Sequence, residues 1–424
     1  MGGLVRRSAA LSVLAGAVIV SGCGRERRSV EGPYAKIAGD AIPRIEEVTG
    51  LAFKTDPKIE GRSRDEVREF LERRFREDLP DAEIAGTQAA YARFGLIPDT
   101  LDLRRFLLDV LTEQVVGYYD PEAKVLYVVR ESPPEQVSMI ISHELVHALQ
   151  DQYMSLDSLQ LLRSDNDRQV AAQAVIEGQA TIVQIQAMLG GRGGDVAAAF
   201  PGGWDRVRDV IREQSSQMPV FATAPRIIQE TLIFPYLSGA EFMRQFQQLR
   251  PGETPYAKMP ASTEQIMHAR AYFNEPDVPT KITLPAPRIG RERYQNNLGE
   301  FETRLFLYEH MRDQSGAVRG AAGWDGDRYA VVTTPQGEAL VWVTIWDSPT
   351  EATDFTEALD RAISRRFDGE LMRPAANGKR YELRNDREVS WWSGEIAGRP
   401  AIIYTDAPSG VGELISPSRV RLEQ

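Results

Sequence analysis

The sequence contains one cysteine, four histidines and only seven lysines among its 424 residues. A single cysteine excludes an internal disulfide framework. The contents of 34 Gly and 25 Pro exclude a collagen-like chain, and the 42% share of hydrophobic residues excludes disordered and polytopic membrane proteins. What remains is a globular protein, and its length suggests two or three domains, each with its own core.

Positive charge is also in deficit, because 50 Lys and Arg stand against 61 Asp and Glu, giving a formal net charge of −11. Nucleic-acid binding rests on clustered basic side chains that neutralise phosphates. The charge balance therefore predicts that nucleic acid is not a partner.

The N-terminus, residues 1–22, has the features of a secretory signal peptide. Arg6 and Arg7 precede an uncharged run from Ser8 to Val20, which is too short to span a bilayer that needs about 20 apolar residues. The end of this run resembles the lipobox of bacterial lipoproteins and implies cleavage before Cys23 and lipidation of its thiol. We therefore expect an exported bacterial lipoprotein, anchored to the membrane through Cys23 and facing the periplasm or cell exterior. The alternative is an ordinary signal peptide that contains a cysteine.

The chain beyond this segment predicts an α+β fold in several parts. Residues 23–61 are mixed and rich in turns, which indicates a tether after the lipidated cysteine. Residues 62–285 are dominated by helical periodicity, with a β-hairpin around an Asp-Pro turn at position 120. Residues 286–424 alternate strand-like runs with one capped helix, which indicates a smaller α+β C-terminal domain.

One predicted helix carries the chemistry. Ser132 and Pro133 open it as expected N-cap and first position, and it contains His143, Glu144 and His147. Imidazoles at positions i and i+4 lie on one helix face and can bind the same Zn²⁺. Glu144 would lie beside the cation and could accept a proton from water there. The alternative, a surface helix with two incidental histidines, would normally carry more charges than this apolar stretch does.

A catalytic zinc ion needs a third protein ligand and an open fourth position. Asp151 lies a full helical turn beyond His147 and is expected to be too far away. Glu177 is the better candidate, because an acidic residue in an apolar, small-residue helix is costly to bury without a compensating cation. Gly178 and Ala180 are expected to let this helix approach the first one closely. The alternative is a partly exposed glutamate on an ordinary helix.

These residues resemble the motif of gluzincin zinc metallopeptidases, which combine HExxH with a Glu from a following helix. The resemblance implies that His143, His147 and Glu177 bind one Zn²⁺ per chain and that Glu144 is the general base. It also implies that the strand before the helix, about residues 125–129, is an edge strand that binds extended peptide. Thr181 departs from the thermolysin-type pattern, which has an Asp there to hold a zinc-binding histidine.

The whole chain is also similar, more loosely, to exported bacterial metallopeptidases of unknown substrate. Three segments carry this likeness: Phe234–Gly239, Ser262–His268 and Gly323–Arg328. Within them, Tyr236 at an expected kink after Pro235 and His268 are candidates for stabilising an oxyanion, with packing or capping as the alternative for each. The sequence assigns no role to Glu264, and the Asp-Gly-Asp at 325–327 is expected to be a turn.

The combined prediction is zinc-dependent hydrolysis of peptide bonds in the cell envelope by a lipid-anchored metallopeptidase, with a peptide or protein as substrate. One alternative is a catalytically inactive zinc-binding lipoprotein that acts as a binding or chaperone-like module. A structural lipoprotein without metal is another. Glu144 favours the enzyme, because a purely structural zinc site needs no base beside it.

Overall fold

The computed structural model describes residues 32–189, 213, 218–367, 371–375 and 377–423, and the fold is mixed α+β as predicted. The expected signal peptide and Cys23 lie outside the described residues. Among the described helices, none is both long and apolar enough to cross a membrane.

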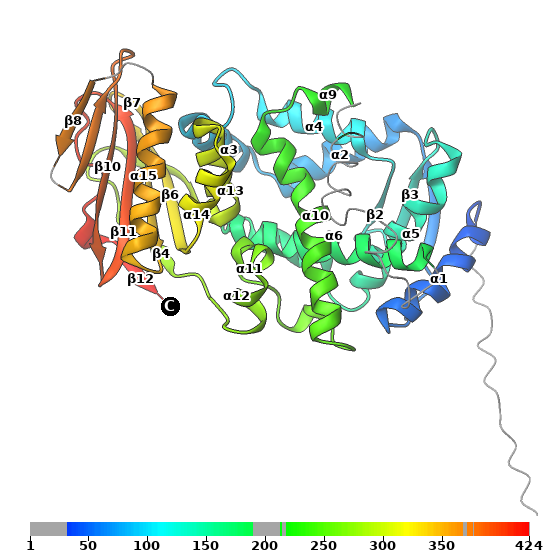
Figure 1. Ribbon diagram of the computed structural model, residues 1–424. Helices are drawn as coiled ribbons and strands as arrows, with labels where there is room; N and C mark the ends of the chain where they lie inside the picture. The colour runs from blue at the N-terminus through cyan, green and yellow to red at the C-terminus, as the bar shows by residue number, and fades with distance from the viewer. Residues whose placement is uncertain (1–31, 190–212, 214–217, 368–370, 376, 424) are drawn as a thin grey trace, which may run out of the picture.

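The N-terminal two thirds of the chain is mostly helical and occupies the right side of Figure 1. Its helices and 3₁₀ turns are α1 (Ala35–Thr49), α2 (Arg64–Asp78), α3 (Asp81–Phe94), α4 (Leu103–Gln114), α5 (Pro134–Asp151), η1 (Leu156–Leu162), α6 (Asn166–Met188), α9 (Pro219–Ala222), α10 (Arg226–Leu249), η2 (Pro255–Ala257), α11 (Thr263–Met267) and α12 (Ala269–Phe273). Ser63 caps α2 in a capping box with Glu66. Ser132 does not cap α5, because its hydroxyl donates to the backbone carbonyl of Val116 and Pro133 is the N-cap.

A three-stranded sheet in this part consists of β1 (Lys58–Arg62), β2 (Gly117–Asp120) and β3 (Val125–Val129). The order is β1-β3-β2, so β3 is the central strand, parallel to β1 and antiparallel to β2. The prediction that residues 125–129 form an edge strand is therefore wrong, because β1 covers that side. The two edge strands are β1 and β2, and β2 directly precedes β3 in the sequence.

The prediction that residues 23–61 form a tether is wrong for the part of this range where α1 and β1 lie. α1 buries five of its side chains against α5 and α6, including Ile42 and Ile45. β1 forms a full five-residue register with β3. Both elements therefore belong to the folded body.

The C-terminal part contains a seven-stranded sheet in the order β5-β6-β7-β11-β10-β9-β8. Its elements are β4 (Lys281–Thr283), β5 (Arg291–Asn296), α13 (Gly299–Met311), α14 (Gln314–Ala321), β6 (Trp324–Thr334), β7 (Gly337–Trp346), α15 (Pro349–Arg366), β8 (Leu371–Ala375), β9 (Gly378–Glu382), β10 (Arg387–Ile396), β11 (Arg399–Pro408), η3 (Pro417–Arg419) and β12 (Arg421–Glu423). The helices α13, α14 and α15 lie on the side of the sheet that faces the helical part (Figure 1). The Asp-Gly-Asp expected as a turn lies inside β6, and both aspartates are buried.

The expected boundary at residue 285 does not separate two cores. One apolar cluster extends from Ala38 to Tyr404. At its centre Phe94 of α3 packs edge-on against Trp342 of β7, with 5.3 Å between ring centroids. Aromatic side chains of the helical part are thus buried in the C-terminal sheet and its helices.

Candidate metal centre

The two histidines of α5 converge at their Nε2 atoms. His143 and His147 are one helical turn apart, and their Nε2 atoms lie 3.2 Å from each other. His147 is buried, whereas the His143 side chain keeps 15% of its surface exposed. The helix therefore presents two ring nitrogens at one point, as the spacing predicts.

Glu177 of α6 completes a cluster of three donor atoms. Its Oε2 lies 3.2 Å from Nε2 of His143 and 3.4 Å from Nε2 of His147. Ligands at about 2.0–2.1 Å from one tetrahedral Zn²⁺ are themselves about 3.3–3.4 Å apart. The three atoms therefore have the mutual spacing of one face of a zinc coordination tetrahedron.

Gln150 fixes the orientation of the His147 ring. Its Oε1 lies 2.8 Å from Nδ1 of His147, and its amide nitrogen donates to the Ile176 carbonyl and to Oε1 of Gln179, each at 2.9 Å. Because the carbonyl oxygen of Gln150 can only accept, Nδ1 carries the proton and Nε2 is left to bind a cation. No sequence pattern predicts this role for Gln150, and the thermolysin-type motif has its supporting residue at position 181 instead.

The electrostatics of the cluster follow from burying charges of opposite sign together. Burial lowers the pKa of His147, but the neighbouring carboxylates, Glu177 foremost, raise it to about 9. Burial raises the pKa of Glu177, but the two imidazoles lower it more strongly. The pKa of Glu177 is therefore well below its usual value. Protons and a metal ion thus compete for the same ring nitrogen.

Glu144 lies beside the three donors without joining them. Its side chain is buried, and burial raises its pKa despite the opposing effect of the two imidazoles. A backbone hydrogen bond from Tyr119 of β2 reaches this carboxylate. The close approach of β2 requires glycine at position 117, where a Cβ would lie 2.4 Å from the Ile140 side chain.

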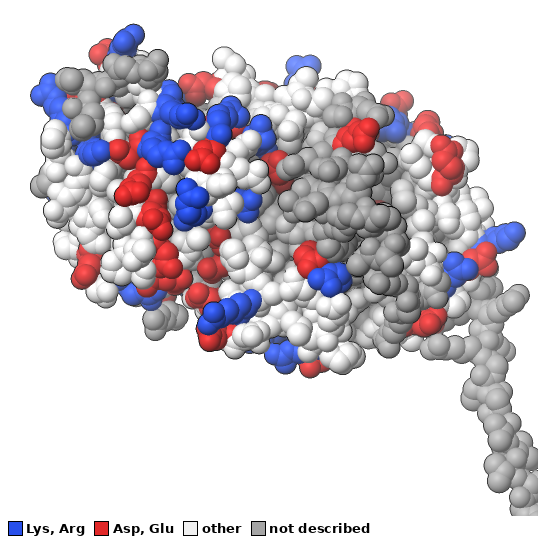
Figure 2. Space-filling view, viewed as in Figure 1, with Lys and Arg blue, Asp and Glu red and all other residues white. Residues whose placement is uncertain are grey.

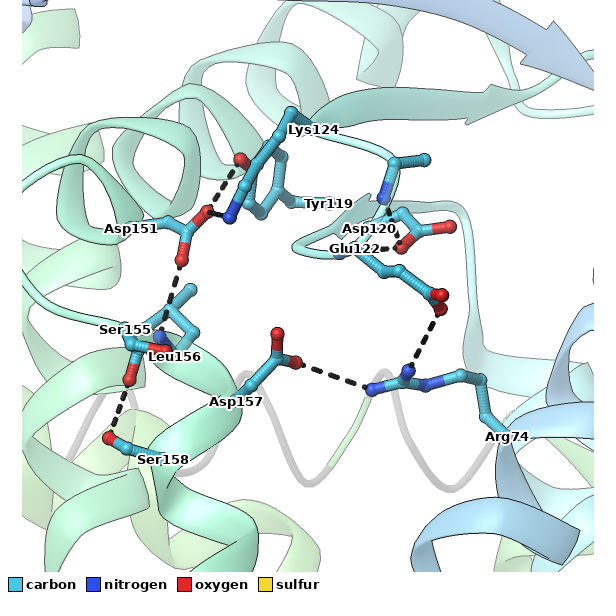
Figure 3. A network of polar contacts seen from close by, with 11 residues as sticks. Arg74, Tyr119, Asp120, Glu122, Lys124, Asp151, Ser155, Leu156, Asp157 and Ser158 are labelled. Carbon is cyan, nitrogen blue, oxygen red and sulfur yellow. Dashed lines mark hydrogen bonds and ion pairs between the residues drawn. The ribbon is translucent and has the colours of Figure 1, made fainter.

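A polar network anchors the β2–β3 hairpin to the end of α5 (Figure 3). The Asp151 carboxylate accepts from the Tyr119 hydroxyl at 2.9 Å, from Nζ of Lys124 at 2.6 Å and from the Leu156 N–H at 3.2 Å. Asp151 is therefore engaged in holding β2 and is absent from the donor cluster, in line with the expectation that it lies too far from the histidines. The network holds β2 against the face of α5 that carries Glu144.

Tyr236 of α10 lies over the cluster. Its ring is stacked on that of His143 with 6.0 Å between centroids, and its residue surface is 37% exposed. The charge of Glu177, burial and a hydrogen bond to Glu177 raise the pKa of Tyr236 well above its usual value. The hydroxyl is thus a neutral donor directed toward the site.

The close crossing of α6 and α10 places Tyr236 over the donor cluster. A Cβ on Gly178 would lie 2.1 Å from the Gly239 carbonyl carbon, and one on Gly239 would lie 2.0 Å from the Ala174 oxygen. The prediction that Gly178 allows α6 to approach α5 is wrong, because its open face packs against α10. Helix α10 continues through Pro235, next to the position of the expected kink.

The structure does not bring His268 to this cluster. Its Nε2 lies 2.9 Å from Oε1 of Glu300 in α13, and this hydrogen bond raises the pKa of His268. Within the described part of the chain, no hydrogen bond, ion pair or ring contact joins His268 to the three donors. The geometry thus favours Tyr236 over His268 as an oxyanion donor.

Two sizeable cavities lie elsewhere. One of about 350 Å³ is bordered by α10, α11, α13 and α14, and one of about 400 Å³ lies against β10 and β11. The residues that line them include none of the three donors or Glu144.

Comparison with known proteins gives one partial match. A protein-family model described as a domain of unknown function (DUF8575) matches residues 287–393, which extend from just before β5 into β10. No curated protein and no solved structure matches the chain. The matched segment contains none of His143, His147 and Glu177, so the interpretation of this cluster depends on geometry and chemistry.

Proposed function

We propose that this chain is a zinc-dependent metallopeptidase that hydrolyses peptide bonds in the cell envelope, anchored through a lipidated Cys23. The observation that carries the proposal is the three donor atoms of His143, His147 and Glu177, which lie 3.2–3.4 Å apart. The lipobox-like sequence before Cys23 supports the location.

The donor set fits zinc, because two imidazole nitrogens and one carboxylate oxygen are ligands of catalytic zinc sites that keep a fourth position open. Glu177 retains 26% side-chain exposure, so the cluster is not sealed by the described residues. Bound Zn²⁺ would supply Lewis-acid polarisation of the scissile carbonyl and would lower the pKa of water at the site.

Glu144 is suited to proton transfer. Its carboxylate lies beside the donors, and its raised pKa favours holding a proton for part of the reaction. It would accept a proton from the attacking water and deliver it to the amine that leaves when the peptide bond breaks. The hydrogen bond from Tyr119 would keep this carboxylate directed at the three donors.

Tyr236 and β2 would position the substrate. The Tyr236 hydroxyl can donate to the carbonyl oxygen as negative charge develops on it. Among the described strands β2 pairs with β3 alone, so its other edge can bind an extended peptide through backbone hydrogen bonds. The substrate backbone would then run past Glu144.

The test compares the wild-type protein with Glu144→Gln. Glutamine keeps the size of the side chain but cannot accept the proton from water, so zinc content should be unchanged while hydrolysis falls about 10²–10⁴-fold. Cleavage is measured by proteomic profiling of peptide libraries and denatured protein, and zinc by elemental analysis of the same samples.

His143→Ala is the matched control, because it should lose zinc and activity together. Identical peptide profiles from zinc-loaded wild-type and Glu144→Gln proteins would contradict the peptidase proposal. That result would favour the alternative of a catalytically inactive zinc-binding module. Absence of zinc from the wild-type protein would favour a structural lipoprotein.

A further inference from the structure

A second group of carboxylates converges where the helical part meets the C-terminal sheet. Glu264 comes from the first turn of α11, Asp277 from the segment after α12, and Asp347 directly follows β7. One carboxylate oxygen of each lies within 4.8 Å of the other two. The group shares no residue with the proposed zinc site.

None of these three carboxylates has a partner among the described residues. Glu264 is 5% exposed, and its Oε2 is buried without a hydrogen bond. No hydrogen bond or ion pair is made by the side chains of Asp277 and Asp347 within the described part of the chain, although the Asp277 backbone carbonyl accepts from Gln265. Buried carboxylates normally accept hydrogen bonds or pair with a cation, so the buried, unpartnered oxygen of Glu264 beside two further carboxylates needs an explanation.

The basic side chains nearby are already engaged. Arg399 pairs with Asp325, and His268 pairs with Glu300. Figure 2 shows acidic side chains gathered in a band over the lower part of α14 and α15 on the viewed face. The charge of Arg399 lowers the pKa of Asp347, but it is outweighed by burial and the neighbouring carboxylates, so the protein offsets the negative charge only in part.

The raised pKa values of Glu264 and Asp347 reflect the electrostatic cost of placing these carboxylates close together. Burial, followed by the charges of Glu300 and Asp277, raises the pKa of Glu264 to about 10. Burial and the charges of Asp277 and Asp325 raise the pKa of Asp347 to about 7. A cation among these oxygens would remove this penalty.

We propose that Glu264, Asp277 and Asp347 form a binding site for a divalent cation that prefers oxygen ligands, with Ca²⁺ as the favoured ion. Oxygens bound to one Ca²⁺ at 2.3–2.6 Å can lie up to about 5 Å apart, which accommodates the observed group. Asp347 is exposed, which leaves room for water to complete the six to eight ligands that Ca²⁺ takes. No nitrogen or sulfur donor belongs to the group, which argues against zinc.

Such an ion would link two neighbouring segments of the helical part to a segment 70 positions further along the chain. It would connect α11 and the segment after α12 to the end of β7, and so join the helical part to the sheet. A ligand that binds only the folded state stabilises it by mass action. The site is therefore expected to control stability and not to take part in hydrolysis.

The experiment measures binding and thermal unfolding of the chelator-treated full chain. At free Ca²⁺ about 100-fold above its Kd, Tm should rise by about 3 °C. Tb³⁺, which replaces Ca²⁺, should bind with one site and give luminescence sensitised by the adjacent Trp346. Asp347→Asn should abolish both signals, and Glu264→Gln should do the same.

Asp354→Asn is the matched control, because it makes the same change at an exposed position of α15 and should leave both signals intact. An unchanged Tm of the wild-type protein in millimolar Ca²⁺ would overturn the proposal and show that protons neutralise the group. Equal Ca²⁺ responses of wild-type and Asp347→Asn proteins would also overturn it, since binding would then lie elsewhere. Zinc content, measured in parallel, should not differ among these variants.

Discussion

The candidate metal centre depends on Gln150 as a positioning residue. Its Oε1 is the partner of Nδ1 in His147, so Gln150→Met should leave that proton unpaired and the ring free to turn. Loss of such a partner weakens metal binding about 10–100-fold. Zinc affinity is measured by competition with a chromophoric chelator.

The conservative variant separates positioning from folding. Gln150→Glu keeps an oxygen acceptor for His147 but loses the two amide donors to Ile176 and Gln179, so it should retain zinc while lowering the unfolding free energy. Equal zinc affinity in the wild-type and Gln150→Met proteins would show that the hydrogen bond does not orient the ring.

Sequence spacing was informative at the scale of residues where helical geometry dictates proximity. His143 and His147 had to share a face, and the structure places Glu177 against them. Gln150 could not be singled out, because an amide three positions after a histidine has no distinctive pattern. Its only signal was a polar side chain directly after the apolar Ala148 and Leu149, and this side chain is fully buried.

At the scale of helices and strands, the stability of the crossing between α6 and α10 should be sensitive to a single added methyl group. Gly239→Ala would place its Cβ 2.0 Å from the Ala174 oxygen, so the helices must separate. We expect a loss of about 1–3 kcal/mol in unfolding free energy, measured by chemical denaturation. The stacking of Tyr236 on His143 should weaken as well.

Gly39→Ala provides the matched control, because this glycine also lies inside a helix but no atom would lie within 4 Å of the added Cβ. The same substitution should there stabilise the protein by about 0.4–1 kcal/mol. Similar effects of the two substitutions would show that the helix crossing tolerates the added methyl group.

The three-stranded sheet shows what local sequence conveys about elements. β3 is a continuous apolar run with all five residues buried, which is typical of a strand covered on both faces. That pattern already favoured a central strand, whereas the edge assignment came from resemblance alone. β1 has mixed polarity and pairs with a strand more than 60 positions away, so no local pattern could reveal it.

For the whole molecule, the sequence pattern changes near residue 285 and the seven-stranded sheet begins at Arg291, but the two parts share one core. Gly86 of α3 packs against Tyr294 of β5, where a Cβ would lie 2.2 Å from the ring. Contacts between segments about 200 residues apart depend on the assembled fold. The C-terminal sheet therefore completes the core of the helical part, and activity should be tested on the whole chain.

A buried acid at this junction should make stability depend on pH. Glu302 of α13 accepts hydrogen bonds from Tyr91 of α3 and Asn166 of α6 at one oxygen, while its other oxygen is buried without a partner. Burial, opposed by these hydrogen bonds, raises the pKa of Glu302 to about 7. Between pH 4.5 and 7 the unfolded chain releases this proton and the folded chain keeps it, so unfolding becomes easier as pH rises.

Glu302→Gln removes this ionisation and keeps the accepting oxygen for Tyr91 and Asn166. Any cost of burying its amide is the same at every pH, whereas the wild-type protein loses on the order of 3 kcal/mol between pH 4.5 and pH 8 through this group. The stability of the variant relative to wild type should therefore increase by about that amount over this range. Chemical denaturation of both proteins at several pH values measures the difference, in which other titrating groups cancel. A difference that is independent of pH would mean that Glu302 ionises alike in the folded and unfolded chains, and that the junction of α3, α6 and α13 tolerates a buried charge.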